Sequence, residues 1–113
     1  MKSILIVAFL SALLIGLANA QVYYKYPEWD RLSDQARAVY IAGAYDSLVS
    51  IASPDTAPAS RHYSKCVARS QLTTEQLAKN VRTFVAAHPD LQKKPVQAGL
   101  INYLVELCGA PPN

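Results

Sequence analysis

The first twenty residues limit what the rest of this 113-residue chain can fold into. One cation, Lys2, is followed by an apolar run over residues 4–17 and by the small-residue triplet Ala-Asn-Ala at 18–20. This order of regions is typical of a cleavable export signal. The run is also shorter than the roughly 20 apolar residues that a membrane-spanning helix needs. We therefore expect residues 1–20 to be removed and residues 21–113 to form a single periplasmic or secreted domain, with no membrane contact after cleavage.

The two cysteines of the mature chain, Cys66 and Cys108, are candidates for a covalent link. Removing the signal leaves 113 − 20 = 93 residues. A domain of this size has a marginal hydrophobic core, so a covalent link adds useful stability. Two cysteines in a small exported chain normally pair in an oxidising compartment. We therefore predict one disulfide, across a sequence separation of 108 − 66 = 42 residues.

An aromatic segment opens the mature chain, and two interpretations of it stay open. It contains Tyr23, Tyr24, Tyr26 and Trp29, and Pro27 interrupts regular structure there. In the first interpretation the segment packs across the core as an extended arm, and Trp29 is structural. In the second it forms a partner-binding patch. Both stay open because tyrosine and tryptophan suit both settings. We favour packing.

A long helix is predicted from Ser33 to about residue 52. Ser33 is a good N-cap, and apolar residues on more than one stripe favour burial of much of the helix. Tyr40 is assigned a structural role. Gly43 costs about 1 kcal/mol of helix propensity relative to alanine, which suggests that another backbone passes close to it. Asp46 is expected to be solvated or hydrogen-bonded to a neighbouring loop.

Three further helices are predicted in the second half. Residues 61–69 favour a short helix, and a capping box at Thr73 begins a longer one with a single apolar stripe. Pro89 ends that helix, and Pro95 begins the last one. No segment alternates with a period of two, so a sheet is not expected. The predicted fold class is all-α, a small helical bundle of about four helices closed by one disulfide. The remaining residues assigned to structural positions are Leu77, Val81, Phe84 and Leu104.

Charge and motifs favour no catalytic or nucleic-acid function. The net charge is +3, and basic residues form no run beyond Lys93-Lys94, so nucleic acid is not an expected partner. His62 and His88 are the only histidines that could activate a nucleophile. His62 lies one helical turn before Cys66, but a cysteine in a disulfide is neither a nucleophile nor a metal ligand. We therefore expect a binding protein without catalytic residues, metal or cofactor.

The order of features between the two cysteines is specific. A Thr-x-x-Gln-Leu helix start at 73–77 is followed by a helix ending in His88-Pro89, a polar turn, and an apolar helix that closes on Cys108. Together with the Tyr-x-x-Gly-x-x-Asp pattern at 40–46, this order resembles the Rap/Tai family of periplasmic immunity proteins. Those proteins protect bacteria against peptidoglycan amidases delivered by type VI secretion. The resemblance implies an all-helical domain, often a homodimer, that binds a cell-wall amidase and blocks its cleft.

The chain departs from that family at one feature. Many members carry a second cysteine pair, with one cysteine in the N-terminal segment and one just ahead of the Tyr-x-x-Gly helix. This chain has Trp29 and Ala38 in those regions and no sulfur.

An inhibitor of this type needs a protruding segment that fits a cleft. The first choice is the loop 53–60 with the residues that follow it, and the second is the polar turn 90–94. Each can equally be a solvated connector, since most loops are. The residues that we predict to contact a partner are Asp55, Arg61, His62, Tyr63, Asp90 and Lys93.

Two alternatives to the immunity role remain. One is a small periplasmic chaperone of the acid-stress type, which exposes apolar surface and loses its packing at low pH. Its basis is size, export, one disulfide and helical content, with only two histidines available as a switch. The other is a helical binding protein whose partner is unknown.

Overall fold

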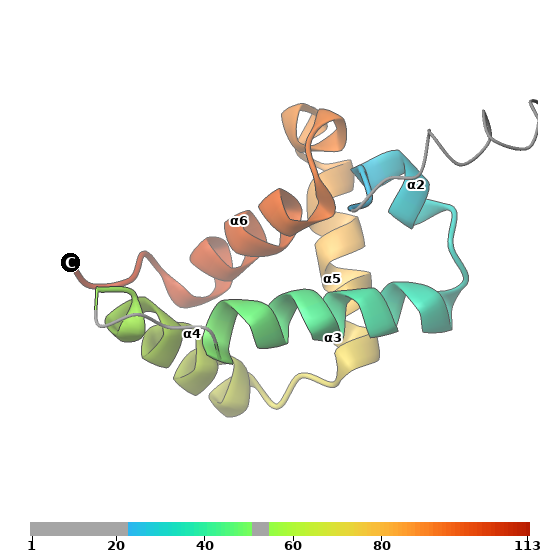
Figure 1. Ribbon diagram of the computed structural model, residues 1–113. Helices are drawn as coiled ribbons and strands as arrows, with labels where there is room; N and C mark the ends of the chain where they lie inside the picture. Colours follow the sequence, from blue (N-terminus) through green and yellow to red (C-terminus); the bar gives the residue numbers. More distant parts are fainter. Residues whose placement is uncertain (1–22, 51–54) are drawn as a thin grey trace, which may run out of the picture.

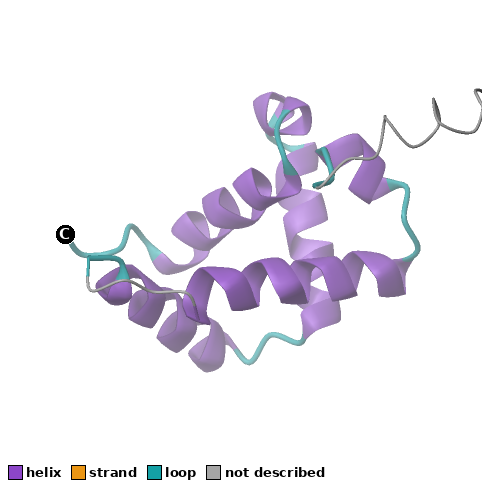
Figure 2. Cartoon of the chain, in the orientation of Figure 1, coloured by secondary structure: helices purple, strands orange, loops and turns teal. Residues whose placement is uncertain are grey.

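The computed structural model describes residues 23–50 and 55–113 (Figure 1). The predicted export signal at 1–20 lies outside the described residues and stays a prediction. Figure 2 shows only helices and loops in the described part, so the all-α class is confirmed. None of the described helices is long and apolar enough to cross a membrane. The elements are α2 (Tyr26–Asp30), α3 (Asp34–Ser50), α4 (Ala57–Ser70), α5 (Thr74–Ala86), the 3-10 helix η1 (Pro89–Lys93) and α6 (Val96–Cys108).

The helices pack around one core with α3 and α5 at its centre. In Figure 1, α5 passes behind α3 at a steep angle, α4 and α6 lie on the side of the C-terminus, and α2 lies at the opposite end. α3 contacts α4, α5 and α6, and α6 also contacts α2, α4 and α5. The largest side chains with no exposed surface are Trp29, Ile41, Val81, Val85, Val96, Leu100 and Leu104.

The predicted disulfide is present. Cys66 in α4 is bonded to Cys108 at the last residue of α6. Next to the bond, the Nε2 atom of His62 lies 2.9 Å from the carbonyl oxygen of Gly109. The disulfide and this contact fix the end of α6 to α4, on the side of the molecule where the chain ends (Figure 1).

The N-terminal segment is joined to the start of α6 by backbone hydrogen bonds. The Tyr26 amide donates to the carbonyl of Lys94 at 3.2 Å, and the Val96 amide donates to the carbonyl of Tyr24 at 3.2 Å. Residues 26–30 are helical and not an extended arm, so that prediction was wrong. Pro27 does not interrupt the element because it occupies the first turn, where its missing N–H is not needed.

Trp29 connects α2 to the core. Its side chain has no exposed surface, and its Nε1–H donates to the carbonyl of Arg37 at 3.3 Å. Ala38, the next residue, is also buried. A tryptophan with a hydrogen-bonded indole therefore connects α2 to α3 without sulfur.

The described parts of the two predicted loops, residues 55–60 and 90–94, are more ordered than the sequence suggests, and residues 53–54 lie outside the described residues. α4 begins at Ala57, inside the predicted loop, with Pro58 in its first turn. Ser60 is buried and donates to the carbonyl of Leu48 at 3.2 Å. The predicted turn after Pro89 is the 3-10 helix η1, whose Leu91 is buried in the core. Packing of these inward-facing side chains explains why neither segment is a free loop.

α5 and α6 follow the predicted pattern closely. Thr73 and Gln76 form the capping box. The Gln76 amide donates to the Thr73 hydroxyl oxygen at 3.2 Å, and the Thr73 amide donates to the Gln76 side-chain oxygen at 2.9 Å. α5 ends at Ala86, shortly before the exposed Pro89, and α6 begins one residue after Pro95. Among the predicted structural positions, Leu77, Val81 and Leu104 are buried, and Phe84 is half-buried.

The glycine prediction was wrong in its location. A Cβ built at Gly43 would have no atom of the described residues within 4 Å, so no other described backbone passes close to it. The close approach occurs at Gly99 in α6, where a Cβ would lie 2.7 Å from Cγ2 of Val85. Val85 is fully buried on α5. The missing side chain at Gly99 therefore lets α6 approach α5.

We expect alanine substitutions at these two glycines to have opposite effects on stability. Gly43→Ala adds helix propensity at an open position and should raise the free energy of unfolding by about 1 kcal/mol. Gly99→Ala forces Val85 out of place, and overpacking of about 1–3 kcal/mol exceeds or cancels the propensity gain. Urea unfolding of both variants measures the difference. Equal stabilisation by both would show that α5 and α6 do not pack this closely.

Candidate functional site

The predicted partner-binding residues do not form one surface. Asp55 and Arg61 are exposed at the start of α4. His62 is half-buried beside the disulfide, and Tyr63 is buried in the core with 5% of its surface exposed. Tyr63 therefore cannot contact a partner, which corrects that prediction. Its position on the inward face of α4 is the physical reason.

The second predicted group lies elsewhere on the molecule. Asp90 and Lys93 are exposed on η1, close to α2, whereas α4 begins next to the C-terminus (Figure 1). Buried Leu91 fixes η1 between these two charges. The two predicted groups are therefore separate, and a single partner segment cannot contact both.

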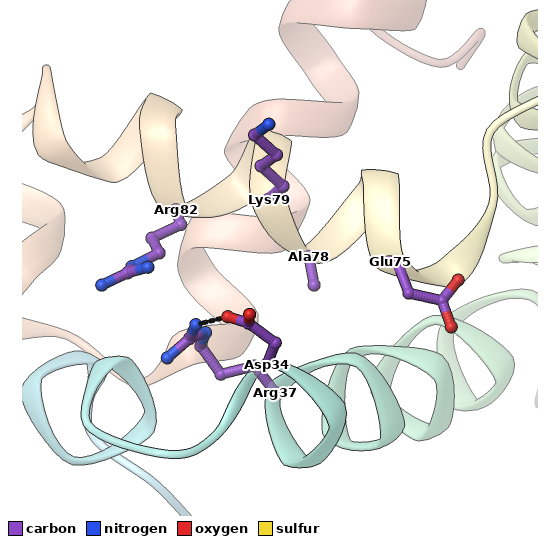
Figure 3. A pocket seen from close by; sticks show the side chains of 6 residues that line it. All are labelled: Asp34, Arg37, Glu75, Ala78, Lys79 and Arg82. Atoms are coloured by element: carbon purple, nitrogen blue, oxygen red, sulfur yellow. Dashed lines mark hydrogen bonds and ion pairs between the residues drawn. The ribbon is translucent and has the colours of Figure 1, made fainter.

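A charged cleft of about 390 Å³ lies between α3 and α5. Figure 3 shows Arg82 reaching from α5 toward the first turn of α3, while the Lys79 amine points away from α3. Arg37 is buried, and it donates to the carbonyl of Asp30 at 2.9 Å, to the carbonyl of Leu32 and to the Asp34 carboxylate. The lining residues are Asp34, Arg37, Glu75, Ala78, Lys79 and Arg82.

The charges around this cleft mainly satisfy one another. The Nε atom of Arg82 donates to the Asp30 carboxylate at 2.6 Å, and this hydrogen bond raises the pKa of the Arg82 guanidinium. The Tyr26 hydroxyl lies 3.4 Å from the same carboxylate oxygen. The lining contains no serine, cysteine or histidine, which nucleophilic or histidine-based acid–base catalysis would require. The cleft is best understood as the polar junction that holds α2 against α3 and α5.

An apolar hollow on the described surface lies where the N-terminal segment meets α3. Its volume is about 470 Å³. The rings of Tyr24 and Tyr40 meet edge to face with centroids 5.2 Å apart. Val39 is 66% exposed and Tyr23 is 52% exposed. We call this the aromatic hollow, lined by Tyr24, Leu32, Ser33, Gln35, Ala36, Val39 and Tyr40.

Part of the aromatic segment packs in the core and part of it is exposed, so each of the two interpretations left open by the sequence applies to one part. Tyr26 and Trp29 belong to the core, whereas Tyr23 and Tyr24 are exposed. An exposed group of aromatic and apolar side chains is the usual composition of a protein-binding surface.

A smaller hollow lies toward the other end of α3. Its volume is about 280 Å³. Ala42, Val67, Leu72 and Leu77 give it apolar walls, and Asp46 lies at its exposed side. We call this the Asp46 hollow; its remaining lining residues are Tyr45, Thr73 and Thr74.

No described residue pairs with the Asp46 carboxylate in a hydrogen bond or ion pair, in agreement with its predicted solvation. Burial raises the pKa of the neighbouring Tyr45 hydroxyl, and the charge of Asp46 raises it further. The hollow therefore combines apolar walls with one unpaired negative charge.

An exposed face of α3 connects the two hollows. Its residues are spaced by three or four positions, so they lie on one side of the helix. We call this the exposed α3 face, which consists of Gln35, Val39, Gly43, Asp46 and Ser50.

Comparison with known proteins adds no relative. No family model, curated protein or solved structure matches this chain. No group of three or more histidine, cysteine or carboxylate side chains in the described part is placed to hold a metal ion. The choice of a candidate site therefore depends on the geometry, which favours the two hollows and the α3 face between them.

Sequence reasoning missed three residues that matter here. Val39 looked like one more core residue of a helix that is apolar on several sides, and only packing shows that it faces out. Arg37 stabilises the α2–α3 junction from a buried position. Its position in the helix could have indicated this burial, because Arg37 precedes the fully buried Ile41 by one helical turn and therefore lies on the same face. The third is Gly43, which the sequence singled out for a close approach within the chain, whereas its position on the open surface was missed.

Buried tyrosines should make the protein less stable in alkali. Burial raises the pKa of Tyr63, and burial followed by the Asp30 charge raises that of Tyr26. A raised pKa in the folded state means that stability is complete below the unfolded value of about 10 and is lost as pH rises through the folded value. Tyr63→Phe should therefore retain more stability than the native protein above about pH 10, by at most 1.4 kcal/mol per pH unit. Urea midpoints over this range, measured for both proteins, test it. Identical alkaline slopes would contradict the prediction.

Proposed function

We propose that the mature chain is an exported, non-catalytic binding protein of the inhibitor type, and that its partner is a cell-wall hydrolase of the amidase class. The observation that carries the binding role is the aromatic hollow, with its exposed Tyr24 and Val39. Exposed apolar groups of this kind are costly for solubility and typically mark an interaction site. The resemblance to immunity proteins supports the choice of an amidase.

The disulfide-closed architecture supports the same proposal. The end of α4 and the whole of α5, η1 and α6 lie between Cys66 and Cys108, so one covalent loop encloses most of the core. A rigid surface loses less conformational entropy on binding than a mobile one. α3 packs on α4, α5 and α6, so the aromatic hollow stands on a fixed support.

A pull-down with inhibition of the captured enzyme tests this proposal. The immobilised mature protein, with its disulfide intact, is incubated with a cell-envelope extract. We expect it to recover an exported amidase and to inhibit the release of peptides from purified peptidoglycan. The reading frame beside the gene should encode that hydrolase. Recovery of no cell-wall hydrolase under these conditions would overturn the proposed function.

Two surface variants locate the binding site. Val39→Asp places a charge in the aromatic hollow without disturbing the core, because Val39 is 66% exposed. It should weaken capture of the amidase by at least about tenfold. Val105→Asp on α6 is the matched control, since Val105 is also an exposed valine, at 38%. Equal effects of the two variants would show that the aromatic hollow is not the site.

A further inference from the structure

Gly43 lies at a position for which the described chain offers no internal reason. Glycine inside a helix costs about 1 kcal/mol relative to alanine. Gly43 is exposed in the middle of α3, and a Cβ there would have no atom within 4 Å. Its missing side chain therefore relieves no contact within the described residues. What it does provide is a stretch of helix surface that another backbone can approach closely.

The two hollows lie on either side of this open position. Val39 in the aromatic hollow precedes Gly43 by one turn, and Asp46 in the second hollow follows it by nearly one turn. Val39 and Asp46 are seven positions apart, a separation of about 10 Å along the helix axis. A second helix that crosses α3 at Gly43 can therefore reach both hollows.

The chemistry of the hollows specifies what such a helix must carry. The aromatic hollow offers Tyr24, Tyr40 and Leu32 to an apolar side chain. The Asp46 hollow offers apolar walls and one unpaired carboxylate, a combination that suits the long stem and charged end of lysine or arginine. In the partly buried setting of a complex, such a pair favours the correct partner over an acidic one.

We propose that the exposed α3 face binds an amphipathic helix of the partner protein, which crosses α3 at Gly43, places an apolar side chain in the aromatic hollow and places a lysine or arginine in the Asp46 hollow. This inference rests on the proposed binding function and names the chemistry that the partner presents. The two partner side chains are about seven positions apart, in either order, because the order depends on the direction of the partner helix.

Peptide binding followed by nuclear magnetic resonance tests the proposal directly. The probes are two alanine-based helical peptides of about 15 residues, each with leucine and lysine seven positions apart, in opposite orders. A third and a fourth peptide carry glutamate in place of lysine. We expect one lysine peptide to shift the amide signals of Val39, Gly43 and Asp46 with saturation. Its glutamate counterpart should bind at least about tenfold more weakly.

Variants of the protein separate this surface from general effects. Gly43→Leu fills the approach surface with a side chain whose Cβ meets no atom of the described residues within 4 Å, so the variant should remain folded and lose peptide binding by at least about tenfold. Asp46→Asn should lose the preference for lysine over glutamate. Ser47→Ala, one residue further along α3 and exposed, is the matched control and should bind like the native protein.

Several results would overturn the inference. No saturable shift in α3 with either lysine peptide would do so, as would unchanged binding by Gly43→Leu. Amide shifts of the same residues that depend on protein concentration alone would assign the face to a second copy of this chain and would also overturn it.

If the amidase is captured but Gly43→Leu captures it equally well, the α3 face is wrong while the proposed function holds. If no amidase is captured but the peptide binds as described, the amidase is wrong while the α3 face holds.

Discussion

Removing the disulfide is expected to cost about 4 kcal/mol of folding free energy. The Cys66–Cys108 bond closes a loop with a sequence separation of 42, and the loss of loop-closure entropy in the unfolded chain gives that magnitude. A small domain has roughly 5–15 kcal/mol in total. The double variant Cys66→Ala/Cys108→Ala should therefore melt roughly 15–30 °C lower than the oxidised protein. Thermal and urea unfolding, followed by far-UV circular dichroism, measure both quantities.

The control for this prediction is the native protein after reduction and alkylation in the unfolded state. Because it also lacks the cross-link, it should resemble the double alanine variant more than the oxidised protein. Single cysteine variants are avoided, since their free thiol can join two molecules. A loss below about 1 kcal/mol in the double variant would contradict the prediction. It would mean that the ends of the loop are already held together in the unfolded ensemble.

Local signals in the sequence were sufficient for much of the fold. The Ser33 hydroxyl accepts a hydrogen bond from the Ala36 amide at 3.2 Å, as an N-cap should. The Thr73 capping box and the apolar stripe of α5 need only residues within a few positions of each other. The disulfide was predictable because the mature chain contains only two cysteines. Each of these features depends on spacing or composition and not on the arrangement of the helices.

The failures concern features that only tertiary packing decides. Pro27 and Pro58 were taken as breaks, but both lie in first turns of helices, where proline is tolerated. The inward contact of Ser60 with α3 extends α4 into the predicted loop. Gly43 and Gly99 each lie inside a helix, and local sequence does not distinguish their roles. Only the position of the Val85 side chain shows that the close approach is at Gly99, whereas Gly43 faces an open surface. The sequence could not supply these neighbours.

The candidate site was less predictable than the fold. One of its tyrosines, Tyr24, lies in the aromatic segment that the sequence left open as a partner-binding patch or as part of the core. In the structure, part of that segment is exposed and part is buried. Asp46 was expected to be solvated or hydrogen-bonded to a neighbouring loop, and it is exposed. Its place beside apolar walls depends on where α4 and α5 cross α3. A binding surface combines residues from several elements, so it becomes visible only when their packing is known.

Truncation of the single tryptophan is expected to have an effect as large as loss of the disulfide. Trp29 is fully buried and its indole donates to the carbonyl of Arg37. Trp29→Ala removes the largest side chain of the core and should cost about 3–5 kcal/mol. It should also free the N-terminal segment, because α2 contacts η1 and α6 around this residue. Urea unfolding followed by circular dichroism measures the loss, since the variant has no tryptophan fluorescence.

Two further variants separate burial from the hydrogen bond. Trp29→Phe keeps most of the apolar volume. Its loss of unfolding free energy should therefore be smaller than that of the alanine variant by about 1–3 kcal/mol. Val39→Ala changes a side chain that is 66% exposed and should alter stability by no more than about 0.5 kcal/mol. A Trp29→Ala protein as stable as Val39→Ala would contradict the assignment of Trp29 to the core. The α2–α3 junction would then have to be held by the hydrogen bonds of Arg37 to the carbonyls of Asp30 and Leu32 and not by the burial of the indole.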